Sequence, residues 1–216
     1  MIFGTIKLED IIDTKETGWL NRVWFTSDNH FSHANILKWM KDSRPYPDVG
    51  KMDNDLLRRY NNSVGKDDIV FHLGDLTLGH MGRNWLRQMK GKIYFCYMPT
   101  HHDKRWITKL GTVPCSSSTN HHVSFFATGT ILEVPFSNGR YNQINITLNH
   151  YATDQWEGSF HQGNWQLHGH YHGTRTADPN HGFAYDVGVD VNNLAPISLA
   201  EIINMGNDWE LGKRRK

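Results

Sequence analysis

The sequence has few cysteines, no long apolar run and almost no net charge, and each shortage excludes a class of protein. Its two cysteines, Cys96 and Cys115, are too few for a disulfide framework and do not form a Cys-x-x-Cys pair. No apolar run approaches the roughly 20 residues that a membrane-spanning helix needs. The N-terminus alternates apolar with charged residues, where a signal peptide would be continuously apolar. We therefore expect a cytoplasmic protein with no membrane partner.

The charges nearly cancel, which argues against a polyanionic partner. There are 23 basic and 22 acidic residues, so the net charge is +1, and only the tail 213–216 is locally basic. Nucleic-acid binding usually needs concentrated positive charge, so nucleic acid is a less favoured partner than a small molecule. No linker-like composition divides the 216 residues. We predict an irregular lead-in over residues 1–21 and a single domain over residues 22–216 that ends in a short basic tail.

Strand-like and helical patterns alternate in the first half of the chain. Apolar, partly β-branched runs at 23–26, 69–73 and 92–98 indicate strands, and helical spacing appears at 34–40, 52–64, 85–89 and 104–110. Strands joined by helices favour parallel βαβ units and an α/β fold. The second half has short strand-like runs at 123–127, 130–135, 143–148, 166–167 and 185–191, and Ser198 and Glu201 form a capping box before a last helix.

Histidine is unusually abundant, and it recurs with aspartate where predicted strands end. The chain has 14 histidines, and histidine is the commonest transition-metal ligand in proteins. Mixed carboxylates and imidazoles suit Mn²⁺, Fe²⁺ or Zn²⁺, and this many ligands allows two ions bridged by one carboxylate. In chain order the metal-capable groups are Asp28 and His30, Asp75, His101 to Asp103, His150, and His170 and His172.

The order of these groups resembles the motifs of the calcineurin-like metallophosphoesterases. That family has Asp-x-His, Gly-Asp, Gly-Asn-His-Asp, a single His and Gly-His-x-His, and the resemblance covers residues 22–203. Several further segments look like its small, single-domain branch from bacterial and phage genomes. They are Thr26–His33, Arg44-Pro45, Tyr60-Asn61, His72–Asp75 and Val187–Asn192.

The resemblance implies a fold and a set of ligands. The fold would be an α/β sandwich of two packed mixed β-sheets flanked by helices, with the site at the strand ends. Two divalent ions would be bound, with Mn²⁺ expected and Fe²⁺, Zn²⁺ or Ni²⁺ as alternatives. The first ion would take Asp28, His30, Asp75 and His172, and the second would take Asp75, His101, His150 and His170. The chain departs from the family at Thr100-His101, where the motif has Gly-Asn.

The resemblance also implies a reaction. A metal-bridging hydroxide would hydrolyse a phosphate ester, with a phosphodiesterase or phosphatase acting on a nucleotide-type substrate as the expected activity. His102 would protonate the leaving oxygen or stabilise the phosphorane, and Asp103 would orient it. The alternatives are a nuclease and a pseudo-enzyme that binds a phosphorylated or nucleotide ligand without turnover. The altered Thr100-His101 pair motivates the pseudo-enzyme hypothesis.

Other residues have weaker predicted roles. We expect His33, Arg44 and Asn61 to contact the substrate, with His168 beside a motif as a further contact. The tryptophans Trp39, Trp85 and Trp106 are expected in the core rather than as base-stacking platforms, because no basic stripe accompanies them. The histidines outside any motif are expected at the surface. They are His121, His122, His161 and His181.

Overall fold

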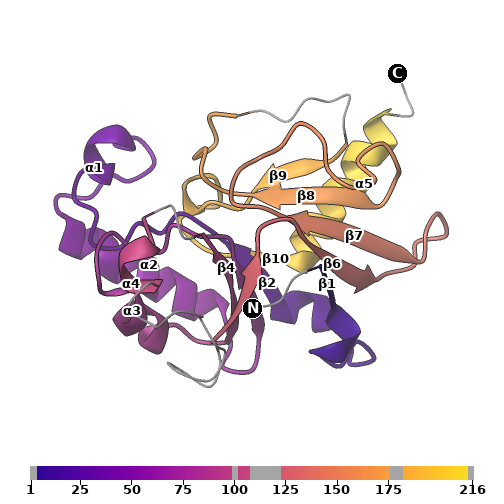
Figure 1. Ribbon diagram of the computed structural model, residues 1–216, viewed down its shortest axis with the longest axis horizontal. Helices are drawn as coiled ribbons and strands as arrows, with labels where there is room; N and C mark the ends of the chain where they lie inside the picture. The colour runs from indigo at the N-terminus through magenta and orange to yellow at the C-terminus, as the bar shows by residue number, and fades with distance from the viewer. Residues whose placement is uncertain (1–3, 99–101, 108–122, 176–181, 214–216) are drawn as a thin grey trace.

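Two five-stranded sheets frame the molecule. The computed structural model describes residues 4–98, 102–107, 123–175 and 182–213 (Figure 1). In the first sheet the order is β10 (Ile197–Ser198), β2 (Val23–Thr26), β3 (Ile69–His72), β4 (Lys92–Tyr97) and β5 (Val123–Ala127), and only β10 is antiparallel to its neighbour. In the second it is β1 (Thr5–Lys7), β6 (Thr130–Pro135), β7 (Gln143–Leu148), β8 (Asn164–His168) and β9 (Ala184–Asp186), and only β6 and β7 are antiparallel. The α/β class with two mixed sheets flanked by helices is confirmed.

The helices fill the connections of the first sheet and follow its last strand. They are α1 (Ile36–Trp39), α2 (Val49–Ser63), α3 (Gly82–Gln88), α4 (Lys104–Ile107) and α5 (Leu199–Lys213), with 3₁₀ turns η1 (Leu8–Asp10), η2 (Trp19–Arg22) and η4 (Val189–Val191). The predicted capping box begins α5, because the Ser198 backbone N–H donates to Glu201 and the Glu201 N–H donates to the Ser198 hydroxyl. Figure 1 shows α2, α3 and α4 on one side of the molecule and α5 on the other.

Side chains alternate between the two faces of the first sheet, so the buried apolar residues form two clusters, one on each face. Phe71 faces the second sheet, whereas its neighbour Val70 faces the helices, as expected for side chains that point to opposite faces. The cluster between the sheets also contains Leu148 and Leu167 from the second sheet. The two sheets therefore pack together through shared apolar side chains, and the carboxyl ends of β2, β3, β7 and β8 are held in fixed positions.

Three expectations about local structure were wrong. The lead-in is not irregular, because Thr5–Lys7 forms β1 parallel to β6. The strand expected over 185–191 ends at Asp186, where the side chain accepts the Gly188 N–H and turns the chain into η4. Trp106 is buried and Trp85 stacks on Phe31 at 4.4 Å, but Trp39 is 66% exposed.

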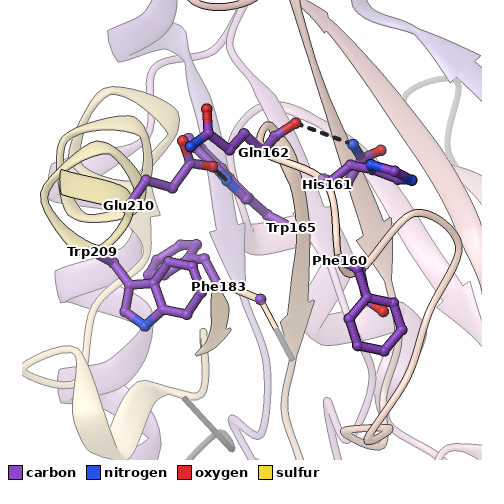
Figure 2. A pocket seen from close by; sticks show the side chains of 10 residues that line it. Phe160, His161, Gln162, Trp165, Phe183, Trp209 and Glu210 are labelled. Carbon is purple, nitrogen blue, oxygen red and sulfur yellow. Dashed lines mark hydrogen bonds between the residues drawn. The ribbon is translucent and has the colours of Figure 1, made fainter. Parts of the chain in front are cut away.

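A pocket of about 220 Å³ lies beside α5, at the amino end of β8 (Figure 2). Its wall includes Glu210, which accepts hydrogen bonds from the Gly163 N–H and the Trp165 indole. Glu210 therefore fixes the start of β8, the strand whose other end leads to His170. His161 is exposed here, as predicted; His121, His122 and His181 lie outside the described residues. Among the described helices, none combines the length and apolarity that crossing a membrane requires.

Candidate metal centre

The structure brings six of the seven predicted ligands together. Asp28 and His30 follow β2, Asp75 follows β3, and the remaining three follow strands of the second sheet: His150 after β7, and His170 and His172 after β8. Because the two sheets pack face to face, ligands from both meet at the carboxyl ends of their strands. The seventh, His101, lies outside the described residues.

The candidate ligand atoms form two groups, and the carboxylate of Asp75 lies close to both. The donor atoms of Asp28, His30 and His172 lie within 4.8 Å of one another, and those of Asp75, His150 and His170 do the same. Oδ2 of Asp75 is 3.6 Å from Nε2 of His30 and 3.6 Å from Nε2 of His150. The carboxylate of Asp75 therefore lies equally close to one histidine of each group, which is the position a bridging ligand would need.

The backbone of these residues is left-handed at five positions. The φ angles are 60° for Asp28, 51° for His30, 56° for Asp75, 70° for His170 and 48° for His172. Such conformations each cost on the order of 1–3 kcal/mol in a non-glycine residue, and they persist where the surrounding structure imposes them. Backbone bonds impose them at the first two strands, where the N–H groups of Asp28 and His30 donate to the carbonyls of Gly74 and Asp75.

Two glycines let the ligand loops approach each other. A Cβ on Gly74, which has φ 114°, would lie 2.9 Å from Nδ1 of His150. A Cβ on Gly169 would lie 2.2 Å from Oγ of Ser27 and 2.6 Å from Oδ2 of Asp28. Any side chain at either position would push a ligand away, so the glycines of the Gly-Asp and Gly-His-x-His motifs are required by packing.

Hydrogen bonds orient two of the imidazoles. Nδ1 of His150 lies 2.9 Å from the Leu73 carbonyl, and Nδ1 of His172 lies 2.6 Å from Oδ2 of Asp190. In both rings Nε2 is left to face the centre, which is the usual arrangement for a metal-binding histidine. Burial opposes protonation of His172, but the Asp190 carboxylate outweighs it and raises the pKa of His172 above its ordinary value.

Several buried polar atoms lack the partner that a metal ion would provide. Within the part of the chain that the structure describes, Oδ1 of Asp28 and both ring nitrogens of His30 have no hydrogen-bond partner. Buried polar groups are rarely left so. Burial raises the pKa of Asp28 to about 6 and lowers that of His30 well below its ordinary value. A divalent cation would restore the charged carboxylate and use the neutral imidazole, so these residues fit a metal.

His102 and His33 lie beside the first group. Their rings are 5.4 Å apart, the His102 ring is 5.2 Å from that of His30, and ligand atoms of all three lie within 4.8 Å of one another. His102 is half-buried and His33 is buried. His102 therefore lies next to the first group of predicted ligands, where it could reach a molecule bound there.

Asp103, the residue predicted to orient His102, supports the loop that follows Asp75. It is fully buried, and its oxygens accept hydrogen bonds from the N–H groups of Leu76 and Thr77 and from the indole of Trp106. Burial raises the pKa of Asp103 to about 6. Its contacts hold the loop that follows Asp75, so Asp103 is a positioning residue.

Two predicted substrate contacts are corrected by the structure. The Arg44 guanidinium is buried, pairs with Asp190 at 2.6 Å and donates to the backbone carbonyls of Asp28 and Asn29. It therefore supports the first ligand loop from behind. The Asn61 amide bonds the Gln88 carbonyl and the Lys90 N–H, so it ties the end of α2 to the chain at the amino end of β4, whereas the predicted ligands follow the carboxyl ends of their strands.

Three supporting residues have no role predicted from the sequence. Asp190 holds Arg44 and His172, and Asp186 accepts the N–H groups of Gly173 and Gly188 around the last ligand loop. His72 is buried and bonds the side chain of Asn29 at 2.8 Å. His72 and Asp190 lie in segments that resemble the small, single-domain branch, and that resemblance is the signal the sequence offers for them.

The chain is similar to proteins whose own roles are open. No family model matches it. An uncharacterized protein of Methanocaldococcus jannaschii is 28% identical over 195 residues, covering 86% of this chain and 92% of that protein. The gene 66 protein of Mycobacterium phage D29 is 28% identical over 211 residues, covering 89% of this chain and all of that protein. A solved structure of a protein of unknown function from Aquifex aeolicus matches with a TM-score of 0.59 and 19% identity over 85% of this chain and 98% of the other, which shows a shared fold.

Proposed function

We propose that this protein is a calcineurin-like metallophosphoesterase that hydrolyses phosphate esters, with a small nucleotide-type molecule as substrate and two divalent ions as cofactors. The observation that carries the proposal is the position of Asp75, whose Oδ2 lies 3.6 Å from ligand atoms of both groups. A carboxylate shared by two ligand groups is the usual feature of two-metal hydrolytic sites. The order of the five motifs along the chain supports the family assignment.

The donor set supports Mn²⁺, with Fe²⁺, Zn²⁺ or Ni²⁺ as alternatives. Asp28, His30, Asp75 and His172 would hold the first ion, and Asp75, His150 and His170 would hold the second, with His101 as its predicted further ligand. Imidazole and carboxylate together favour these ions over Mg²⁺, which prefers oxygen ligands in regular octahedral geometry. Bound at these ligands, divalent ions supply Lewis acidity, which acidifies water and neutralises charge on phosphoryl oxygens.

The protein's own residues have separate tasks in this proposal. The left-handed loops hold the carboxylates and imidazoles in place before substrate arrives, so little reorganisation accompanies the reaction. His102, whose ring lies 5.2 Å from that of His30, is the group that delivers a proton to the departing alkoxide. Arg44 and Asp103 act from outside the site by holding the loops that carry Asp28 and Asp75.

The near-neutral chain supports a small substrate over a long polyanion. The net charge is +1, whereas binding to nucleic acid through many phosphates would need several clustered cations. A phosphorylated ligand bound without turnover is the competing hypothesis, and the replacement of Gly-Asn by Thr100-His101 motivates it.

The test is a metal analysis combined with a hydrolysis screen. The purified protein is loaded with Mn²⁺, and p-nitrophenyl phosphate, its bis-ester, linear nucleotides and cyclic nucleotides are compared. We expect two ions per chain and turnover of at least one ester class. Two bound ions with no turnover of any of these esters would favour the binding-only hypothesis.

Asp75→Asn tests the bridging assignment. This variant should hold one ion or fewer and lose hydrolysis, because both ions would share this carboxylate. Asp67→Asn is the matched control, since it makes the same chemical change on an exposed side chain before β3. Two ions and a parental rate in Asp75→Asn would refute the two-metal proposal.

A further inference from the structure

Trp39 is a strongly exposed aromatic residue close to the first group of predicted ligands. Its side chain is 66% exposed at the end of α1, and its ring centroid is 5.4 Å from that of His33 in an edge-to-face contact. The His33 ring is in turn 5.5 Å from that of the ligand His30. One imidazole therefore separates the indole from the first ligand group. Figure 1 shows α1 standing out at the edge of the molecule.

The segment that carries Trp39 is tied to the centre at both ends. On one side Ile36 is buried in the core between the helices and the first sheet. On the other, Ser43 and Arg44 donate hydrogen bonds to Asp190, the same carboxylate that accepts from His172. The position of the indole is therefore fixed relative to the metal ligands, although α1 is only four residues long.

An indole held in this way is suited to stacking. A tryptophan presents a large, flat apolar surface, and stacking of a base on an aromatic side chain is tolerant of base identity. Among the described residues, Trp39 belongs to neither core cluster, and most of its side chain is open to solvent.

We propose that Trp39 is a specificity-determining residue that stacks against the planar base of a nucleotide-type substrate. The inference rests on the proposed function in one respect: the phosphate must be bound at the metal centre, with or without turnover, for the base to reach Trp39. Ring separations of 5.5 and 5.4 Å mark the path from His30 through His33 to the indole. A sugar placed between phosphate and base fills such a gap, whereas an aryl phosphate would hold its ring at the phosphorus.

The experiment compares two ligands that differ only in the base. The non-hydrolysable phosphonate analogues of adenosine 5′-monophosphate and ribose 5-phosphate are titrated calorimetrically into the Mn²⁺-loaded full chain. Trp39→Ala and Trp39→Phe are compared with the parent. Phe160→Ala is the matched control, because Phe160 is 67% exposed and lies in the segment before β8, on the wall of the pocket beside α5 (Figure 2).

We expect the parent to bind the adenosine analogue about tenfold or more tightly than the ribose analogue. Trp39→Ala should bring this ratio close to one, Trp39→Phe should keep part of it, and Phe160→Ala should keep all of it. A parental ratio near one, an unchanged ratio in Trp39→Ala, or an equal loss of both ligands would each overturn the inference. The measurement needs no turnover, so base recognition through Trp39 in a chain that hydrolyses nothing would refute the proposed function and leave this inference standing.

Discussion

Asp190 accepts a hydrogen bond from Nδ1 of His172 at 2.6 Å, and the two residues are 18 positions apart in the chain. The same carboxylate pairs with the Arg44 guanidinium at 2.6 Å. Arg44 and the hydrogen bonds of His172 and Ser43 outweigh the effect of burial and hold the pKa of Asp190 well below its ordinary value. Asp190 therefore stays ionised, and one negative charge fixes both a predicted metal ligand and the arginine behind the first ligand loop.

Replacement of Asp190 should weaken metal binding without removing a ligand. Asp190→Asn keeps the shape but removes the charge that orients His172, and loss of such a partner typically costs about 10- to 100-fold in metal affinity. The variant should also be less stable, because Arg44 would be left as a buried, unpaired charge. Calorimetric Mn²⁺ titration and urea unfolding measure the two effects. Asp55→Asn, which breaks a surface ion pair with Arg59, should leave metal affinity unchanged.

Loss of His102 should slow hydrolysis but spare metal content. We expect His102→Ala to bind two ions and to lose about 10²- to 10⁴-fold in rate on esters with poor leaving groups. The deficit should shrink for p-nitrophenyl esters, because p-nitrophenolate leaves without protonation. An equal loss on both kinds of ester would assign His102 to substrate binding or to structure.

His101 should alter which metal supports activity. The sequence places a histidine where the resembled motif has asparagine, and a nitrogen donor favours Zn²⁺, Fe²⁺ or Mn²⁺ over Mg²⁺. His101→Asn should keep two ions and shift the preference toward Mg²⁺, which activity measured in each metal would reveal. If parent and variant have the same metal preference and the same affinity at the second site, His101 is not a ligand.

Asp53 should make the folded state less stable as the pH rises. Burial raises the pKa of Asp53 to about 6, against the opposing effects of the Ser32 N–H and Arg44. The folded state therefore binds a proton more tightly than the unfolded chain does, and stability is lost between about pH 4 and pH 6. Asp53→Asn keeps an acceptor for Ser32 but has no charge to bury. It should match the parent near pH 3 and exceed it by about 2 to 3 kcal/mol at pH 7.5 in urea unfolding.

The sequence predicted the parts of this molecule that depend on local pattern. The bounds of β6 and β7 agree with the strand periodicity, and the strand-end motifs identified six candidate ligands that the structure brings together. Contacts between segments that are far apart in the chain could not be predicted, because no local sequence pattern indicates them. Arg44 and Asp190 are 146 residues apart, and nothing in either segment indicates that they pair.

The wrong predictions concern residues whose surroundings depend on contacts between distant segments. Arg44 was interpreted as a substrate contact because a buried arginine and an exposed one look the same in sequence. Trp39 was assigned to the core because tryptophan usually packs there, whereas the short α1 turns it outward. β1 has three residues, too few to show strand periodicity. It forms because the edge of β6 is available for pairing.

The left-handed loops at the candidate centre imply that metal binding, if it occurs, requires the folded chain. The five residues with positive φ angles take up that geometry only when packed against the sheets, so an unfolded chain has no preformed site. An ion that binds the folded chain alone stabilises it by RT ln(1 + [metal]/Kd), or about 2.7 kcal/mol when the metal concentration is 100 times Kd. The melting temperature should therefore rise with metal concentration, and the dependence would report the affinity of the proposed centre for the ion even in a variant without activity.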